Sequence, residues 1–220
     1  DHRDLHSFPT RRSSDLTGYR VVNLHDLISE LGEDTTVRIL SDFSCPLNRD
    51  VEFFLSRKAI DFAKNGWAQT HLVFASYRGE WVLVGYFTLA NKYICVSTKR
   101  LGSASSSLRR RIAKFATFDQ ALKKYILPAP LIAQLGKNYS NNYNSLITGG
   151  ELLEEACSKI KRLQLDVGGK FAYLECEDKS KLIDFYSENG FCEFDHRLLD
   201  RDEVDKLEGH YLVQMLKYIK

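Results

Sequence analysis

The alternation of apolar and polar residues divides the chain into segments of helical and of strand periodicity. Helical spacing predicts helices over 21–31, 48–66, 108–122, 152–163 and 179–189. Runs rich in β-branched and aromatic residues predict strands over 36–40, 67–77, 80–90, 92–97, 127–138, 171–176, 191–194 and 210–219. Strands alternate with helices, but a hairpin turning at Arg78-Gly79 is embedded among them. The pattern therefore favours an α/β fold built on a mixed sheet.

Polar residues, glycines and prolines mark the ends of these elements. Asn48 is placed as the N-cap, and Gly66 as the stop, of the helix between them. The serine-rich residues 102–107 predict a flexible loop. Pro128 and Pro130 suit the first residues of a strand better than its centre. No repeat or interdomain linker is evident, so residues 17–220 are expected to form a single domain.

The first sixteen residues, DHRDLHSFPTRRSSDL, resemble a translated short-read sequencing adapter. We exclude them from the fold as one would a cloning scar, so His2, His6 and the Arg11-Arg12 pair enter no site. The segment contains as many arginines as aspartates, and the formal net charge of +2 is the same without it.

Composition restricts the class of protein further. At 44% hydrophobic residues the chain can bury a sizeable core. Its five cysteines, which have no CxxC or metal-like spacing, are expected to be reduced thiols of a cytoplasmic protein. No apolar stretch approaches the ~18 residues of a membrane span. No spacing of His, Cys or Asp indicates a metal ion.

One segment has the composition of a phosphate-binding loop. QLGKNYSNNYNSLITGGELL, residues 134–153, joins a predicted strand to a predicted helix through small polar residues and Gly149-Gly150. The first turn of a helix has unpaired N–H groups and a favourable dipole, and glycines let a ligand approach the backbone. Neither GxxxxGK[ST] nor GxGxxG is present, so a plain loop with a glycine at the helix start remains an equal alternative.

Three segments taken together resemble the GCN5-related N-acetyltransferase (GNAT) family, over roughly residues 41–220. They are LVGYFTLA, the loop with Gly149-x-x-Leu-Leu, and YLECED followed by KLIDFYSENGF. FSCPLNRDVEFFLSRKAIDFAKNGWAQTHLVF also resembles the branch that includes the acetyltransferase toxins of bacterial toxin–antitoxin pairs. The resemblance implies a mixed, mostly antiparallel sheet of about six to seven strands with helices on both faces. The loop departs from the family pattern, since Ile147 and Ser145 stand where glycine or a basic residue is common.

The resemblance also implies acetyl-CoA as co-substrate, with no metal. Pantetheine is expected along the strand 132–137, and the pyrophosphate on the N–H groups of the loop. The expected cofactor-binding residues are Gln134, Leu135, Gly136, Lys137, Ser145, Ile147, Thr148, Gly149 and Gly150.

For catalysis, the resemblance implies direct attack of a neutral primary amine on the thioester. Tyr186, which matches the family's tyrosine, is expected to be the general acid for the leaving thiolate. Glu175 is the candidate general base, and Glu177 points to the same face of its strand. A solvated strand end, with a chain of water molecules as the base, is the alternative.

Charge along the chain bears on the acceptor. Residues 81–118 contain no acidic and seven basic residues, and residues 171–220 contain twelve acidic and seven basic ones. The basic stretch is a solvated face, a receptor for the 3′-phosphate of CoA, or an RNA contact through Lys99–Lys114. The acceptor is expected to be a small-molecule or protein amine, with the α-amine of aminoacyl-tRNA as the toxin-like alternative. A non-catalytic CoA-binding module is the other alternative, and a homodimer is a further expectation.

Overall fold

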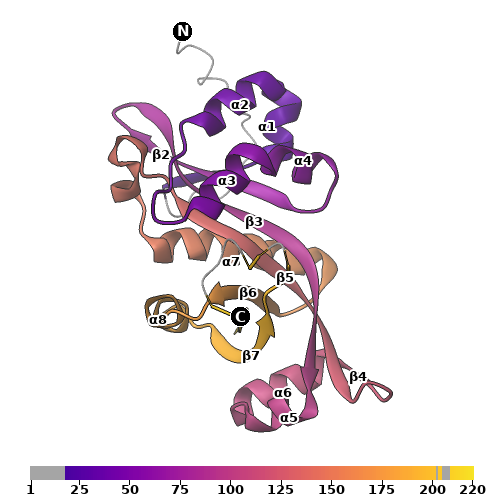
Figure 1. Ribbon diagram of the computed structural model, residues 1–220. Helices are drawn as coiled ribbons and strands as arrows, with labels where there is room; N and C mark the ends of the chain where they lie inside the picture. The colour runs from indigo at the N-terminus through magenta and orange to yellow at the C-terminus, as the bar shows by residue number, and fades with distance from the viewer. Residues whose placement is uncertain (1–17, 202, 205–208) are drawn as a thin grey trace. The chain divides into compact units, whose positions relative to one another are not determined.

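The computed structural model describes residues 18–201, 203–204 and 209–220 (Figure 1). The adapter-like residues 1–16, and Thr17, lie outside the described residues. The strands form an eight-stranded sheet. Seven of them follow the order β1-β2-β3-β5-β6-β8-β7, and the eighth, β4, pairs with β5 outside this order. β5 and β6 pair in parallel, whereas β1-β2, β4-β5, β6-β8 and β7-β8 are antiparallel. The expected mixed, mostly antiparallel sheet is confirmed, with more strands than expected.

The chain forms two compact units, and unit 1 comprises the described residues up to Thr88 together with Gln134–Glu155. Its elements are β1 (Tyr19–Asn23), α1 (Leu24–Leu31), α2 (Glu33–Ser41), α3 (Arg49–Arg57), α4 (Ala59–Lys64), β2 (Gln69–Tyr77) and the 3₁₀ helix η2 (Ser140–Leu146). The first part of β3 (Glu80–Ser97), the last part of β5 (Lys124–Lys137) and the start of α7 (Gly149–Val167) also belong to it. Helices α1–α4 bury their apolar faces with β2 and β3 in one core, which includes Leu27, Leu55, Leu72 and Tyr86.

Unit 2 comprises Leu89–Ala133 and Ala156–Lys220. Besides the remaining parts of β3, β5 and α7, its elements are α5 (Thr98–Ser103), α6 (Ser106–Phe115), β4 (Thr117–Asp119), β6 (Phe171–Glu177), α8 (Ser180–Glu188), β7 (Cys192–Leu198) and β8 (Tyr211–Tyr218). A second core contains Ile94, Ile112, Leu127, Phe171 and Leu216. β3, β5 and α7 each have residues in both units. The division into units does not test the expected single domain, which stays a prediction.

Several predicted boundaries are confirmed. Asn48 caps α3, its side-chain oxygen accepting from the N–H groups of Asp50 and Val51. The hairpin between β2 and β3 turns at Arg78-Gly79, and β3 runs on through the predicted strand 92–97. The single helix predicted over 48–66 is two helices, α3 and α4, with a break at Lys58.

The strand predicted over 36–40 was wrong, because these residues lie in α2. The β-branched residues of this run favour a strand by propensity alone. Thr36 and Leu40 are nevertheless both buried, and their spacing of four residues is that of one helical face. Tertiary burial therefore outweighs local propensity in this segment.

The predictions for residues 102–122 were partly wrong. The expected serine-rich loop contributes to α5 and α6, with Ser97 and Ser105 as their N-caps. The expected helix over 108–122 ends at Phe115, and β4 follows it. Pro128 and Pro130 lie inside β5, between the residues that pair with β4 and those that pair with β6, and not at the first residues of the strand as expected.

Candidate functional site

The last residues of β5 continue beyond the part of the strand that pairs with β6. The parallel ladder joins Leu131 to Tyr173 and Ile132 to Leu174, and ends there. Within the described chain, β5 runs on to Lys137 without a further β6 partner. The predicted cofactor-binding strand, residues 134–137, is therefore a strand edge whose N–H and C=O groups on that side are free to pair with a ligand.

Two glycines bring helices close to this part of the sheet. A Cβ added to Gly136 would lie 2.3 Å from Val51 Cγ1 of α3, and one added to Gly85 would lie 3.1 Å from Leu152 Cδ2 of α7. Tyr86, the next residue of β3, is fully buried and donates its hydroxyl to the Val51 carbonyl at 2.6 Å. Since successive strand residues point to opposite faces, α3 and α7 cover opposite faces of β3. Gly136 is needed for close packing of α3 on β5.

The backbone of the loop after β5 is fixed by two side chains. Lys137 Nζ donates to the carbonyls of Asn144 (2.8 Å) and Ile147 (2.9 Å). Tyr19 of β1 donates its hydroxyl to the Leu146 carbonyl at 3.0 Å. Burial, with Glu151 next in importance, raises the pKa of Tyr19 to about 12, so this phenol stays a donor at neutral pH. Side chains from two strands, β5 and β1, therefore bind carbonyl groups of this loop.

A capping box opens α7. Glu151 Oε2 accepts from the N–H and the hydroxyl of Thr148, both at 2.7 Å, and the Glu151 N–H donates to Thr148 Oγ1 at 3.1 Å. The Thr148 contacts lower the pKa of Glu151. The N–H groups of Gly149 and Gly150 have no acceptor among the described residues. These two N–H groups are the part of the predicted phosphate-binding loop that remains available to an anion.

The other two predicted loop residues differ in exposure. Ser145 is exposed, and its hydroxyl donates to the Asn142 carbonyl at 2.8 Å. The Ile147 side chain is 2% exposed and belongs to the core. Ile147 can therefore meet a ligand only through its backbone.

Sequence reasoning missed Asn138, the residue that joins β5 to the loop. Its fully buried side chain accepts from the N–H groups of Ser44 and Ser140, both at 3.0 Å. It donates to the carbonyls of Leu83 (2.9 Å) and Asp42 (3.2 Å). All the hydrogen bonds of this amide are thus used to fix the path of the chain after Lys137. Only the position of Asn138, immediately after an apolar strand, could have indicated it.

Tyr186, the predicted general acid, lies on α8 in unit 2. Its ring is half-buried against Phe185 and Phe191, with centroids at 5.0 and 6.1 Å. No described residue forms a hydrogen bond with its hydroxyl. Burial, and secondarily the neighbouring Cys176 thiol, raises the pKa of Tyr186 above its ordinary value. The phenol is therefore neutral at pH 7 and can act only as a donor there.

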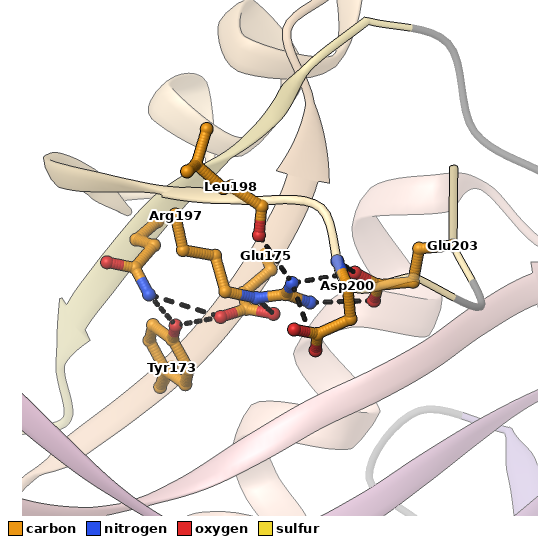
Figure 2. A network of polar contacts seen from close by, with 7 residues as sticks. Tyr173, Glu175, Arg197, Leu198, Asp200 and Glu203 are labelled. Carbon is orange, nitrogen blue, oxygen red and sulfur yellow. Dashed lines mark hydrogen bonds and ion pairs between the residues drawn. The ribbon is translucent and has the colours of Figure 1, made fainter.

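Glu175, the predicted general base, lies at the centre of a polar network (Figure 2). Oε2 accepts from Arg197 Nε at 2.7 Å, while Oε1 accepts from Gln214 at 3.1 Å and from the Tyr173 hydroxyl. The Arg197 guanidinium also binds both carboxylate oxygens of Glu203 at 2.7 Å. The side chain of Glu175 is only 10% exposed. Both oxygens of the predicted base are already occupied by donors.

Glu177 and Cys176 complete this strand. Glu177 pairs with Lys179 at 3.1 Å. Cys176 is buried, and burial together with nearby carboxylates raises the pKa of its thiol to about 11, so it is not a nucleophile at neutral pH. Within the described residues, no group of His, Cys, Asp or Glu is arranged to hold a metal ion, and no helix is long and apolar enough to cross a membrane.

Comparison with models of protein families found no match, nor did comparison with curated proteins. Solved structures do match. A complex of AtaT with acetyl-methionyl-tRNAfMet has a TM-score of 0.57 and 17% identity, covering 89% of this chain and 93% of that one. A bacterial toxin has a TM-score of 0.58 and 15% identity over 91% and 90%. AtaTR bound with AcCoA has a TM-score of 0.50 and 16% identity over 89% and 92%. The chain has the fold that these proteins share, which confirms the fold expected from the sequence.

Proposed function

We propose that this protein is an acetyl-CoA-dependent N-acetyltransferase, which moves an acetyl group to a primary amine by direct attack on the thioester. The observation that carries the proposal is the end of β5, which continues to Lys137 after its ladder with β6 has ended at Ile132. Pantetheine contains amide groups that pair with such a strand edge. The same fold has been solved with AcCoA bound in AtaTR.

The residues of unit 1 supply the proposed CoA site. The backbones of Gln134, Leu135, Gly136 and Lys137 would pair with pantetheine. The N–H groups of Gly149 and Gly150 would bind the pyrophosphate, because they have no acceptor among the described residues and lie in the first turn of α7. Around them, Ser145 offers a hydroxyl, Ile147 its backbone and Thr148 the cap that aligns the turn.

Tyr186 is the proposed donor to the leaving thiolate. A thiol has a pKa of ~8.5 and an ordinary phenol one of ~10, so full proton transfer is uphill by ~2 kcal/mol. Burial raises the pKa of Tyr186 further, which makes the transfer more uphill. Tyr186 therefore acts mainly by donating a hydrogen bond that strengthens as charge develops on sulfur.

The acceptor amine must lose a proton, since an alkyl amine of pKa ~10.4 is only about one part in a thousand neutral at pH 7. Glu175 is the proposed destination of that proton. Because Arg197, Gln214 and Tyr173 already donate to its oxygens, the proton would reach Glu175 through water. A chain of water molecules that acts as the base without Glu175 stays the alternative.

The experiment is a thiol-release assay with acetyl-CoA and a panel of amines, preceded by calorimetry with acetyl-CoA. Binding followed by amine-dependent thiol release supports the proposal. Binding without release from any amine, charged tRNA included, supports a non-catalytic CoA-binding module instead. Absence of binding contradicts both functions.

A second candidate acceptor is the α-amine of aminoacyl-tRNA, favoured by the basic surface of α5 and α6. Lys99, Arg109 and Arg110 are exposed and have no ion pair among the described residues. AtaT, which shares the fold, has been solved with acetyl-methionyl-tRNAfMet. An Arg109→Gln/Arg110→Gln variant should bind tRNA more weakly. The slope of log K, the association constant, against log salt should become less negative by about 2, because each phosphate contact contributes ~0.9. An unchanged slope would exclude this surface.

Location and assembly belong to the same proposal. All five cysteines are free thiols, which supports a cytoplasmic location. The fold shared with a bacterial toxin supports a bacterial-type protein. A homodimer stays a prediction, which light scattering at several protein concentrations would test.

A further inference from the structure

Three side chains gather where β2 ends and the loop before α7 begins. Tyr77, the last residue of β2, and Tyr143 of η2 meet edge to face, with ring centroids 6.0 Å apart. The Arg78 guanidinium lies 5.0 Å from the centroid of the Tyr77 ring. Both tyrosines are half-buried, and Arg78 is exposed. An aromatic surface with a cation beside it therefore borders the proposed CoA loop.

The turn that carries Arg78 does not explain the choice of arginine. Arg78 has a φ of 53° and Gly79 one of 85°, as in a two-residue hairpin turn of type I′. Asn, Asp and Gly are favoured at the first position of such a turn, because positive φ is unfavourable for longer side chains. Arg78 also has no hydrogen bond or ion pair among the described residues. The backbone geometry of the turn does not account for this cation, and its local contact is the ring of Tyr77.

Lys137, the cation at the start of the loop, already has hydrogen-bond partners. Lys137 donates to two loop carbonyls, those of Asn144 and Ile147. Its ammonium group is therefore part of the loop's framework rather than a free receptor for a phosphate. Arg78, held over the Tyr77 ring by a cation–π contact, is the charge on this border that remains available.

We propose that Arg78 binds the 3′-phosphate of CoA, and that Tyr143 with Tyr77 presents an aromatic surface to the adenine ring. This rests on the proposed function, because the same loop is taken to hold the pyrophosphate. The planar guanidinium presents paired donors that match a phosphate, and aromatic rings stack on purines. The site would distinguish CoA from CoA that lacks the 3′-phosphate.

Calorimetry with CoA and with 3′-dephospho-CoA tests the role of Arg78. The unaltered protein should bind CoA about tenfold more tightly than dephospho-CoA, as expected for one charge-assisted phosphate contact. Arg78→Asn should abolish this difference and leave the affinity for dephospho-CoA unchanged. Because Asn suits a positive φ, the variant should melt no lower than the unaltered protein. Arg57→Asn, at the exposed end of α3, is the matched control and should retain the tenfold difference.

Tyr143→Leu tests the aromatic surface. It should weaken CoA and dephospho-CoA equally, by several-fold, and leave 4′-phosphopantetheine, which has no adenosine, unaffected. Equal affinity of the unaltered protein for CoA and dephospho-CoA would overturn the inference while leaving the proposed function standing. So would an Arg78→Asn variant that weakens both ligands alike. If the unaltered protein binds neither ligand, the inference and the proposed function both fail.

Discussion

Replacing Gly136 by alanine should destabilise the protein, because α3 lies directly against this glycine. The added Cβ would be 2.3 Å from Val51 Cγ1, 3.5 Å from Phe43 and 3.6 Å from Tyr86. Val51 is buried and β-branched, and one rotamer dominates for such a residue in a helix. The Tyr86 hydroxyl bonds the Val51 carbonyl at 2.6 Å, so α3 cannot move away without losing that bond. We expect a loss of ~3 kcal/mol, at the upper end for overpacking.

A double-mutant cycle identifies the contact responsible. Val51→Ala alone removes two buried methyl-sized groups and should cost about 1.6 kcal/mol, at ~0.8 kcal/mol each. In the Gly136→Ala background it removes the clash, so the two effects should fall short of additivity by at least ~1 kcal/mol. Urea unfolding followed by circular dichroism gives each midpoint, provided that the m-values agree.

Gly102→Ala is the control for this cycle. A Cβ there meets nothing within 4 Å in α5, so the change should be neutral or stabilise by up to ~1 kcal/mol. If Gly136→Ala is as stable as Gly102→Ala, or if the cycle with Val51→Ala is additive, the contact of α3 with Gly136 does not limit the packing.

Three further predictions concern the proposed site. Tyr186→Phe should leave acetyl-CoA affinity unchanged in calorimetry but lower turnover at least tenfold; unchanged turnover would remove Tyr186 from the mechanism. Glu175→Gln should lower the free energy of unfolding by ~1–3 kcal/mol, because Arg197 loses a charged acceptor; if Glu175 also accepts the proton, the pH profile of kcat/KM should lose its acidic limb. Thr148→Ala should cost ~1 kcal/mol at pH 7 in urea unfolding. Since the cap lowers the pKa of Glu151, its contribution is present above the unfolded-state pKa and should shrink as the pH falls through the folded-state value; an equal loss at pH 7 and pH 3 would contradict this.

The elements that could be predicted from the sequence are those with local signals. Asn48 satisfies N–H groups two and three residues ahead, and Arg78-Gly79 is a complete two-residue turn, so neither depends on distant contacts. The strand prediction for residues 36–40 was wrong because burial of Thr36 and Leu40 fixes the helix there. Local propensity contains no information about this burial.

Only those parts of the site that lie within a single strand or loop could be predicted from the sequence. Alternation along β6 placed Glu175 and Glu177 on one face, but Arg197, the partner that occupies Glu175, lies 22 residues away on β7. Asn138 was missed for the same reason, since its bond to Ser44 spans 94 residues. Such polar networks need the tertiary structure, because nothing in the local sequence selects their partners.

The central claim is acetyl transfer from CoA to an amine, and the most direct measurement incubates the protein with radiolabelled acetyl-CoA and a panel of amines that includes charged tRNA. We expect the amount of CoA thiol released to equal the amount of label gained by one amine, and both to be at least tenfold lower for Tyr186→Phe. Tight binding of acetyl-CoA with no label on any amine, and thiol release no faster than without protein, would contradict it.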